Sequence, residues 1–133
     1  MTSSEEQCIF CNKTNCKIIK STKYFFIIRD TAYPVTEHHT LIISNRHVSD
    51  YFDLNNNELL ELNEILKSQK NEIQKLDKKI NGFNIGVNIG KDAGQSIMHC
   101  HIHLIPRRDG DVENPQGGVR SVIPKNQHYK RKI

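Results

Sequence analysis

The chain has 133 residues and a formal net charge of +4, and 36% of its residues are hydrophobic. This length suits one domain with its own core, and the composition excludes an intrinsically disordered chain. We therefore expect a single domain over residues 1–133. Residues 1–106 hold equal numbers of basic and acidic side chains, so the whole excess of positive charge lies in a basic C-terminal tail, residues 107–133. A tail of this kind often indicates nucleic-acid binding.

The sequence shows no sign of membrane insertion or secretion. The longest aromatic and aliphatic run, Tyr24 to Ile28, is far shorter than the roughly 20 residues that a membrane-spanning helix needs. The first seven residues lack the basic start and apolar stretch of a secretory signal. We expect a cytoplasmic protein without a membrane partner. Because the cytoplasm is reducing, the four cysteines are expected to be metal ligands or buried thiols rather than disulfides: Cys8, Cys11, Cys16 and Cys100.

Three short strands are predicted in the first third of the chain. Residues 16–20 and 23–29 are rich in aromatic and β-branched side chains and are bounded by polar residues. Pro34 interrupts this pattern, and residues 40–43 resume it. We expect these segments to belong to one sheet.

A long amphipathic helix is predicted after the third strand. Asn55 and Glu58 form a capping-box pattern at its start. Apolar residues then recur at three-, four- and seven-residue spacing as far as Ile80. Asn81 and Gly82 supply the expected stop.

Two further strands are predicted in the second half. Residues 83–89 and 99–105 alternate between apolar and polar side chains, with a loop at 90–94 between them, and Pro106 is expected to end the second strand. Residues 119–123 are a candidate short edge strand. The predicted fold class is α+β, an antiparallel sheet of about five strands with one long helix.

Three histidines occupy alternate positions of the last long strand, at His99, His101 and His103. Strand side chains alternate, so the three rings should share one face about 7 Å apart, and the residues between them should face the core. A polar face that happens to be rich in histidine is the ordinary alternative. Adjacent imidazoles disfavour each other's cationic form, so at least one ring should be neutral at neutral pH. A neutral imidazole is a nucleophile that can attack phosphorus and form a covalent intermediate.

Three histidines that are each followed by an apolar residue are also a family signature. In this respect the chain resembles the histidine triad (HIT) superfamily of nucleotide hydrolases and transferases, and the resemblance covers nearly the whole chain. Residues 39–43 and 46–48 resemble the segment that precedes the long helix in that family. Residues 110–120 are similar to the tail of members that hydrolyse diadenosine tetraphosphate. The resemblance implies a HIT-like fold, and a homodimer in which two sheets join.

The resemblance implies catalytic roles for three histidines. His101 would attack the α-phosphorus and form a nucleotidyl-histidine, which water then hydrolyses. His103 would orient the nucleophile or bind a phosphate oxygen, and His39 would line the same site. These roles agree with the general chemistry of phosphoryl transfer, which depends on positioning and charge stabilisation.

The resemblance also implies substrate-binding positions. Asn88, Gln95 and Ser96 stand where relatives contact the phosphate or the leaving group, although a plain turn is the ordinary interpretation of Gln95 and Ser96. Relatives often carry an acidic or amide residue eight positions before the equivalent of His39 to hold ribose. Here that position is Thr31, and Asp30 stands next to it.

A metal site is predicted at the N-terminus. Cys8 and Cys11 have a spacing that lets both thiolates reach one zinc ion, but they are only half of a site. Ordinary reduced thiols and a redox pair are the alternatives. The motif resembles that of zinc-containing HIT members, which implies His47 and His99 as the other ligands of one structural Zn²⁺ per chain. Cys16 remains a possible replacement ligand.

The leading functional hypothesis is a hydrolase that cleaves nucleoside 5′-phosphate anhydrides, such as diadenosine tetraphosphate. A nucleoside phosphoramidase, an aminoacyl-adenylate hydrolase and a dinucleoside polyphosphate phosphorylase are the enzymatic alternatives, and a nucleotide-binding module is the non-enzymatic one. Arg107, Arg108 and Arg120 favour a long polyphosphate through charge-assisted contacts. A nucleic-acid partner is not expected, because the tail lacks interleaved aromatic residues apart from Tyr129.

Overall fold

A computed structural model describes residues 7–130 of the chain. Residues 1–6 and 131–133 lie outside the described part, and with them Arg131 and Lys132 of the predicted basic tail. The regular elements are five strands and one α-helix: β1 (Ile18–Ser21), β2 (Phe25–Arg29), β3 (Thr40–Ser44), α2 (Asn56–Leu76), β4 (Ile80–Gly86) and β5 (His101–Arg108). Short 3₁₀ helices connect them: η1 (Lys13–Asn15), η2 (Tyr51–Asp53), η3 (Lys91–Ala93), η4 (Gly118–Val122) and η5 (Pro124–Asn126).

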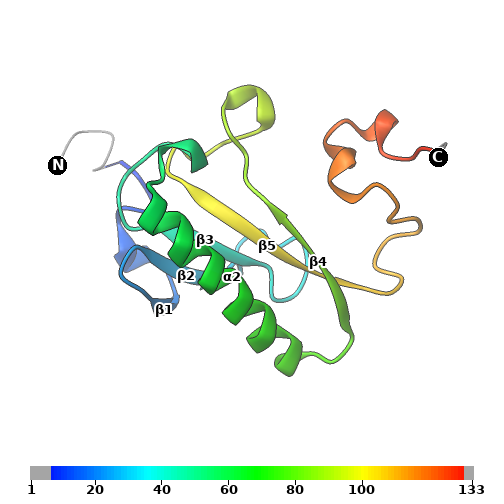
Figure 1. Cartoon of the computed structure of the whole chain (residues 1–133), viewed down its shortest axis with the longest axis horizontal. Helices are drawn as coiled ribbons and strands as arrows, with labels where there is room; N and C mark the ends of the chain where they lie inside the picture. Colours follow the sequence, from blue (N-terminus) through cyan, green and yellow to red (C-terminus); the bar gives the residue numbers. More distant parts are fainter. Residues whose placement is uncertain (1–6, 131–133) are drawn as a thin grey trace.

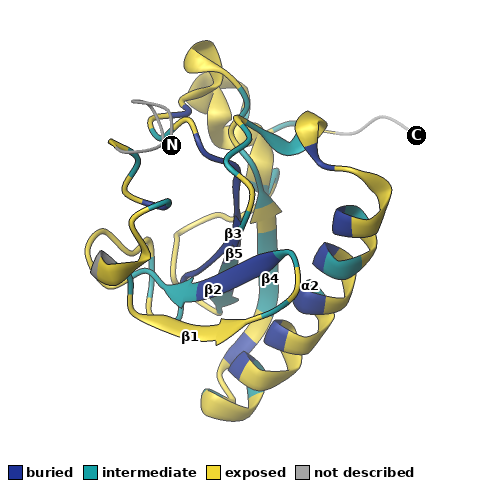
Figure 2. Cartoon of the chain, turned by 90° about the vertical axis from the view of Figure 1, so that its left-hand side faces the viewer, coloured by how far each residue is buried: buried dark blue, intermediate teal, exposed yellow. Residues whose placement is uncertain are grey.

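The five strands form one antiparallel sheet in the order β1-β2-β3-β5-β4. Helix α2 lies along one side of the sheet (Figure 1) and turns its buried residues toward the strands (Figure 2). This architecture confirms the predicted α+β class with five strands and one long helix. It also places β5, the histidine strand, between β3 and β4 in the interior of the sheet.

Both faces of the sheet are covered by apolar side chains. The face toward α2 buries a cluster from the sheet, from α2 and from the segments beside them: Phe25, Ile27, Ile42, Leu54, Leu62, Ile65, Cys100 and Ile102. The opposite face buries a smaller cluster, namely Phe10, Phe26, Leu41 and Ile43. Cys100 and Ile102 thus lie on the helix side, as the alternation of the strand predicts, and the histidines lie on the other.

Helix α2 begins where the capping pattern predicts and ends earlier than expected. The Glu58 N–H donates to Asn55 Oδ1 and the Asn55 N–H donates to Glu58 Oε1, each at 2.9 Å. The helix ends at Leu76, because the Asp77 carboxylate accepts from the Lys79 N–H at 2.9 Å in a non-helical turn. Ile80 continues the apolar pattern from the first position of β4, so the prediction of a helix through this residue was wrong. No helix among residues 7–130 is long and apolar enough to cross a membrane.

Strand β5 also continues beyond its predicted end. Pro106 lies inside the strand and pairs with Phe83 of β4. Pairing of β5 with β3 stops at Leu104, opposite Thr40. Because β5 extends past β3 here, the missing N–H of Pro106 costs no hydrogen bond on that side.

The expected edge strand at 119–123 does not form. Residues Gly118–Val122 are the 3₁₀ helix η4, in a tail that extends away from the sheet and helix (Figure 1). Gly117 precedes it with a φ of 92°, and a Cβ on this residue would lie 2.1 Å from the Gln127 carbonyl oxygen. A glycine is needed at this position, and the turn that it makes replaces the extended conformation.

Candidate active site and metal centre

Four potential metal ligands converge from three segments: Cys8, Cys11, His47 and His99. Their ligand atoms all lie within 4.8 Å of one another. Cys11 Sγ lies 3.1 Å from His47 Nδ1, Cys8 Sγ lies 3.3 Å from His99 Nδ1, and the two Nδ1 atoms are 3.1 Å apart. Ligands bound to zinc at about 2.0–2.3 Å in a tetrahedron stand roughly 3.3–3.8 Å from each other. The observed spacing is close to that arrangement.

Hydrogen bonding directs a lone pair of His99 into this cluster. His99 Nε2 donates to the carbonyl oxygen of Ser44 at 2.7 Å, since a carbonyl oxygen only accepts. The neutral ring therefore has its lone pair on Nδ1, facing the two cysteines. Burial lowers the pKa of this imidazole and keeps it neutral. Two thiols and two imidazole nitrogens are the donor set of a closed structural zinc site, so the residues present fit Zn²⁺.

Phe10 connects the cysteine loop to the histidine strand. Its side chain is 4% exposed and stands between the two cysteines in the sequence. The ring packs edge-on against His99 and His101, with ring centroids 5.8 and 5.1 Å apart. Any displacement of the cysteine loop would therefore also disturb His101.

His101 has a defined protonation pattern. Its Nδ1 lies 2.7 Å from the carbonyl oxygen of His99 and must donate to it. The neutral ring then carries its lone pair on Nε2. Burial lowers the pKa of His101, although the bond to the His99 carbonyl opposes this shift. At neutral pH the side chain is a neutral imidazole with a nucleophilic Nε2.

His103 has the opposite pattern, which His39 and Val35 impose. The Val35 N–H donates to His39 Nδ1 at 3.1 Å, so the neutral His39 ring holds its proton on Nε2. His39 Nε2 then donates to His103 Nδ1 at 2.9 Å. The proton of His103 is consequently on Nε2. His103 thus has an N–H at the ring position where His101 has a lone pair.

Burial keeps both members of this pair neutral. Burial most of all, together with the neighbouring His101 and His39, lowers the pKa of His103 to about 4. Burial likewise lowers the pKa of His39, which is 2% exposed. The Asp30 carboxylate, 3.8 Å from His39 Nδ1, opposes both shifts. Asp30 and the Val35 N–H thus approach the same ring nitrogen.

Gln95, Ser96 and Asn88 stand around the loop that precedes the histidine strand. The buried Gln95 donates both amide hydrogens, to the carbonyls of Ser49 and Ile97 at 2.6 and 3.1 Å. Its Oε1 accepts from the Gly90 N–H at 2.9 Å. Asn88 and Ser96 are exposed, and Ser96 lines a cavity beside the cysteine cluster. Gln95 therefore stabilises the loop, and contacts of these three residues with a substrate remain predictions.

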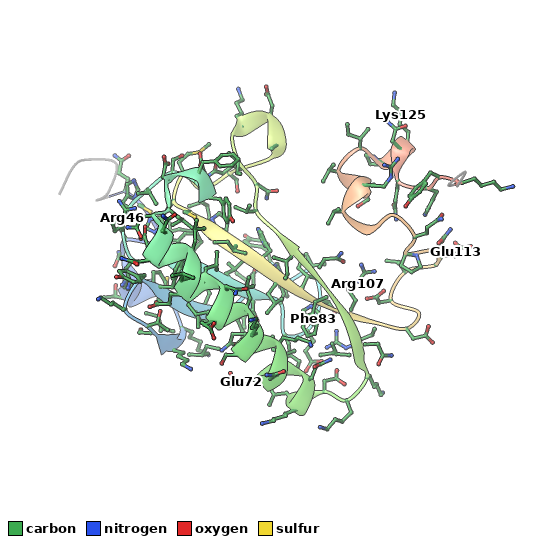
Figure 3. The ribbon with its side chains drawn as sticks, in the orientation of Figure 1. Arg46, Glu72, Phe83, Arg107, Glu113 and Lys125 are labelled. Atoms are coloured by element: carbon green, nitrogen blue, oxygen red, sulfur yellow. The ribbon has the colours of Figure 1, made fainter. Side chains whose placement is uncertain are left out.

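Arg107 is engaged within the protein. Its Nε and Nη2 bind the Asp111 carboxylate at 2.8 and 2.9 Å, and its Nη1 donates to Asn84 Oδ1 at 2.7 Å. Figure 3 shows Arg107 beside β4, whereas Lys125 lies in the distant part of the tail. Held in this way, Arg107 lines a cavity of about 290 Å³ together with Val35 and Ile105. Its contact with a polyphosphate stays a prediction.

Arg108 also has all of its guanidinium nitrogens engaged. Nε pairs with Asp77 at 2.9 Å, Nη1 donates to Thr36 Oγ1 at 2.9 Å, and Nη2 donates to the Glu37 carbonyl at 3.2 Å. The side chain joins the end of α2 to the β2–β3 loop. This use differs from the polyphosphate contact that the sequence suggested.

Two features of the site were outside the sequence-based predictions. The Val35 N–H acts through the main chain, which carries no residue-specific signal. The bridging role of Arg108 depends on contacts with residues distant in the sequence, such as Thr36. By contrast, the position of Asp30 next to the expected ribose-binding position was a usable signal, and the structure places its carboxylate beside His39.

Comparison with known proteins agrees with this geometry. Residues 12–110 match the HIT domain family. An uncharacterized HIT-like protein of Methanocaldococcus jannaschii is 32% identical over 111 residues, which cover 80% of this chain and 83% of the relative. The asymmetrical bis(5'-nucleosyl)-tetraphosphatase of Schizosaccharomyces pombe is 36% identical over 95 residues, which cover 71% of this chain and 50% of the relative.

A solved structure of a zinc-bound family member has a similar fold. The crystal structure of a Zn-bound histidine triad family protein from Mycobacterium smegmatis superposes with a TM-score of 0.73 at 28% identity, over 83% of this chain and 81% of that chain. The family match covers well over half of the chain and includes the whole histidine strand. This chain therefore belongs to the HIT domain family.

Proposed function

We propose that this protein is a hydrolase of nucleoside 5′-phosphate anhydrides, with dinucleoside polyphosphates such as diadenosine tetraphosphate as its substrates. The observation that carries the proposal is the opposite protonation of two neighbouring rings. His101 presents a lone pair at Nε2 and His103 presents an N–H. A nucleophile beside a hydrogen-bond donor suits attack on an anionic phosphorus centre. The name of the fission yeast tetraphosphatase, a HIT relative, supports the substrate class.

In the first step, His101 Nε2 attacks the α-phosphorus. An N–P bond forms, the anhydride P–O bond breaks, and the oligophosphate leaves as an anion. The His103 Nε2–H donates a hydrogen bond to a phosphate oxygen, where negative charge grows. The His101 ring becomes cationic, and the His99 carbonyl at Nδ1 stabilises that charge.

In the second step, water attacks the phosphorus of the nucleotidyl-histidine. The N–P bond breaks, His101 returns to its neutral form, and the proton of the water passes to solvent. The nucleoside monophosphate then leaves. Arg107, Asn88, Gln95 and Ser96 are the proposed substrate-binding residues, and His39 holds His103.

We assign the metal to Zn²⁺, one per chain, held by Cys8, Cys11, His47 and His99. When bound, the ion supplies a structural cross-link and keeps His99 Nδ1 deprotonated. Two contacts of the protein also fix this part of the chain: His99 donates a hydrogen bond to the Ser44 carbonyl, and the Phe10 ring packs on His101. The Zn-bound mycobacterial relative supports this assignment.

We infer a homodimer that joins two sheets at β4, an edge strand. Ile85 on this strand is 52% exposed, and a cavity of about 380 Å³ lined by Leu59, Leu66 and Val87 lies beside it. Ile85→Lys would place a charge at this edge, so it should convert the protein to monomers in light scattering. A wild-type protein that is already monomeric would contradict the inference.

Product analysis tests the function. A panel of dinucleoside polyphosphates and an adenosine phosphoramidate is incubated with the protein, with and without inorganic phosphate. We expect a nucleoside monophosphate and the complementary oligophosphate, at a rate independent of phosphate. Nucleoside diphosphate formed only with phosphate would indicate a phosphorylase, and a strong preference for the phosphoramidate would indicate a phosphoramidase. No turnover with tight nucleotide binding would favour a binding module.

A further inference from the structure

The loop between β2 and β3 delivers the Val35 N–H to His39. Residues 31–35 are exposed, and Val35 itself is 69% exposed. His38 adopts a left-handed backbone with a φ of 71°, which is unfavourable for a residue other than glycine. An exposed loop with such a turn needs an anchor if Val35 is to stay in place.

Arg108 supplies that anchor. It donates to Thr36 Oγ1 on one side of the turn and to the Glu37 carbonyl, the peptide group that precedes His38. Its bond to Asp77 fixes the guanidinium to the end of α2. Within residues 7–130, it is the only side chain from outside residues 29–40 that is hydrogen bonded to residues 31–38.

Two groups compete for His39 Nδ1. The Val35 N–H, at 3.1 Å, requires a lone pair there, whereas the Asp30 carboxylate, at 3.8 Å, favours a proton there. If Val35 withdraws, the neutral His39 ring can move its proton from Nε2 to Nδ1 and donate to Asp30. His103 must then donate from Nδ1 to His39 Nε2, so its own proton leaves Nε2. Each ring keeps one proton, but His103 would present a lone pair to the anionic substrate.

We propose that Arg108 is a positioning residue that sets the direction of the His39–His103 hydrogen bond by holding Val35 on His39. Arg108 does not touch the substrate and acts through the loop. The effect on turnover rests on the proposed function, whereas the effect on the imidazole protons does not.

Nitrogen NMR of the free protein tests the proposal. Spectra of ¹⁵N-labelled protein are recorded at about pH 8, where imidazoles are neutral. In the wild type we expect protons on Nε2 of His39 and His103 and on Nδ1 of His101. In Arg108→Met, His39 and His103 should shift toward the Nδ1–H form, while His101 is unchanged. A wild-type His39 with its proton on Nδ1 would overturn the proposal.

Two further variants separate positioning from folding. Thr36→Val removes one of the hydrogen bonds that anchor the loop and keeps the Arg108–Asp77 pair. It therefore tests the anchoring role even if Arg108→Met does not fold. Lys79→Gln removes an exposed positive charge near the same end of α2 and should change no imidazole signal. Wild-type signals for His39 and His103 in Thr36→Val would contradict the anchoring role.

Removal of the competing group supplies a rescue. Asp30→Asn keeps an oxygen for the Tyr33 N–H and removes the carboxylate charge. Combined with Arg108→Met or with Thr36→Val, it should return the protons of His39 and His103 to Nε2. If Arg108 only stabilises the fold, the double variants will not recover the wild-type imidazole signals. Failure to recover would contradict the claim that Asp30 and the Val35 N–H compete for His39 Nδ1.

Kinetics then link the protons to turnover. Loss of one oxyanion donor lowers kcat by about 100-fold or more. A partial shift of the His103 proton from Nε2 to Nδ1 in Arg108→Met should therefore lower kcat at least about tenfold and change KM by less than about threefold. A rise in KM at constant kcat would instead make Arg108 a polyphosphate ligand and overturn the positioning role. Correct imidazole signals in a wild type without turnover would count against the proposed function alone.

Discussion

His101 and His103 stand two residues apart on β5 and carry their ring protons on opposite nitrogens. The His99 carbonyl fixes the proton of His101 on Nδ1, and His39 fixes that of His103 on Nε2. The two ring centroids are 5.3 Å apart, closer than the 7 Å spacing that strand geometry alone suggests. The lone pair of one ring and the N–H of the other are therefore close enough for a single phosphate group to meet both.

His101→Ala should abolish hydrolysis, with a loss of at least about a thousandfold, because it removes the proposed nucleophile. Wild-type protein mixed with substrate and quenched in denaturant should gain the mass of one nucleotidyl group. His128→Ala, an exposed tail histidine, serves as the control and should label normally. A labelled His101→Ala protein would show that another residue is the nucleophile.

The stability of the fold should depend on pH through His103. Its pKa falls from 6.5 to about 4 on folding, so the unfolded chain binds more protons between these values. Stability is therefore full above pH 6.5 and is lost as the pH falls toward 4. We expect the free energy of unfolding to be about 2 kcal/mol lower near pH 5 than near pH 7.5 from this group alone. Urea titrations should show a smaller pH effect in His103→Gln, and an equal effect would contradict the assignment.

Metal content should depend on each of the four proposed ligands. Cys11→Ser should lose the metal and lower Tm, since the site joins the N-terminal loop to His99, just before β5. Cys16→Ser is the matched control: Cys16 lies outside the four-residue cluster and should leave the metal content unchanged. Elemental analysis after purification without chelators measures both. If Cys16→Ser also loses the metal, the ligand set is different.

The Arg46–Glu58 pair should stabilise the start of α2. Glu58 is fully buried, and Arg46 binds both of its oxygens, at 2.7 and 3.1 Å. Arg46→Ala should cost about 2 kcal/mol in urea unfolding, less than the loss of a fully buried partner, because Arg46 is half exposed. The Arg46 hydrogen bonds lower the pKa of Glu58, so this contribution is present at neutral pH and is lost in acid as the carboxylate protonates. Glu58→Ala completes a double-mutant cycle, and a coupling energy of zero would disprove the interaction.

Local patterns predicted most of the fold. The capping box of Asn55 and Glu58 and the alternation of β5 are short-range signals, and the structure reproduces both. The end of α2 was harder to predict, because Ile80 packs beside Ile73 in the same cluster whether it continues a helix or begins a strand. The helix ends before Ile80 because the Asp77 side chain accepts a hydrogen bond from the Lys79 N–H in a turn.

The candidate site was predictable where its residues carry side-chain chemistry. The cluster of Cys8, Cys11, His47 and His99 matches the expected ligand set. The partners of Arg107 and Arg108 differ in this respect. Asp111 lies four residues from Arg107, a local signal that the sequence-based predictions did not use, whereas Asp77 lies 31 residues before Arg108 and meets it only once β4 and β5 have paired. Arginine composition alone does not show whether a guanidinium is already occupied.

His99 has two separate functions in one residue. Its imidazole faces the cysteines, and its main-chain carbonyl holds the proton of His101. Substitution can remove the first function but not the second, because every amino acid has the carbonyl. A substitution that withdraws the imidazole from the cysteines therefore leaves the carbonyl that orients His101, so loss of the proposed metal site would reach His101 only through the packing of Phe10.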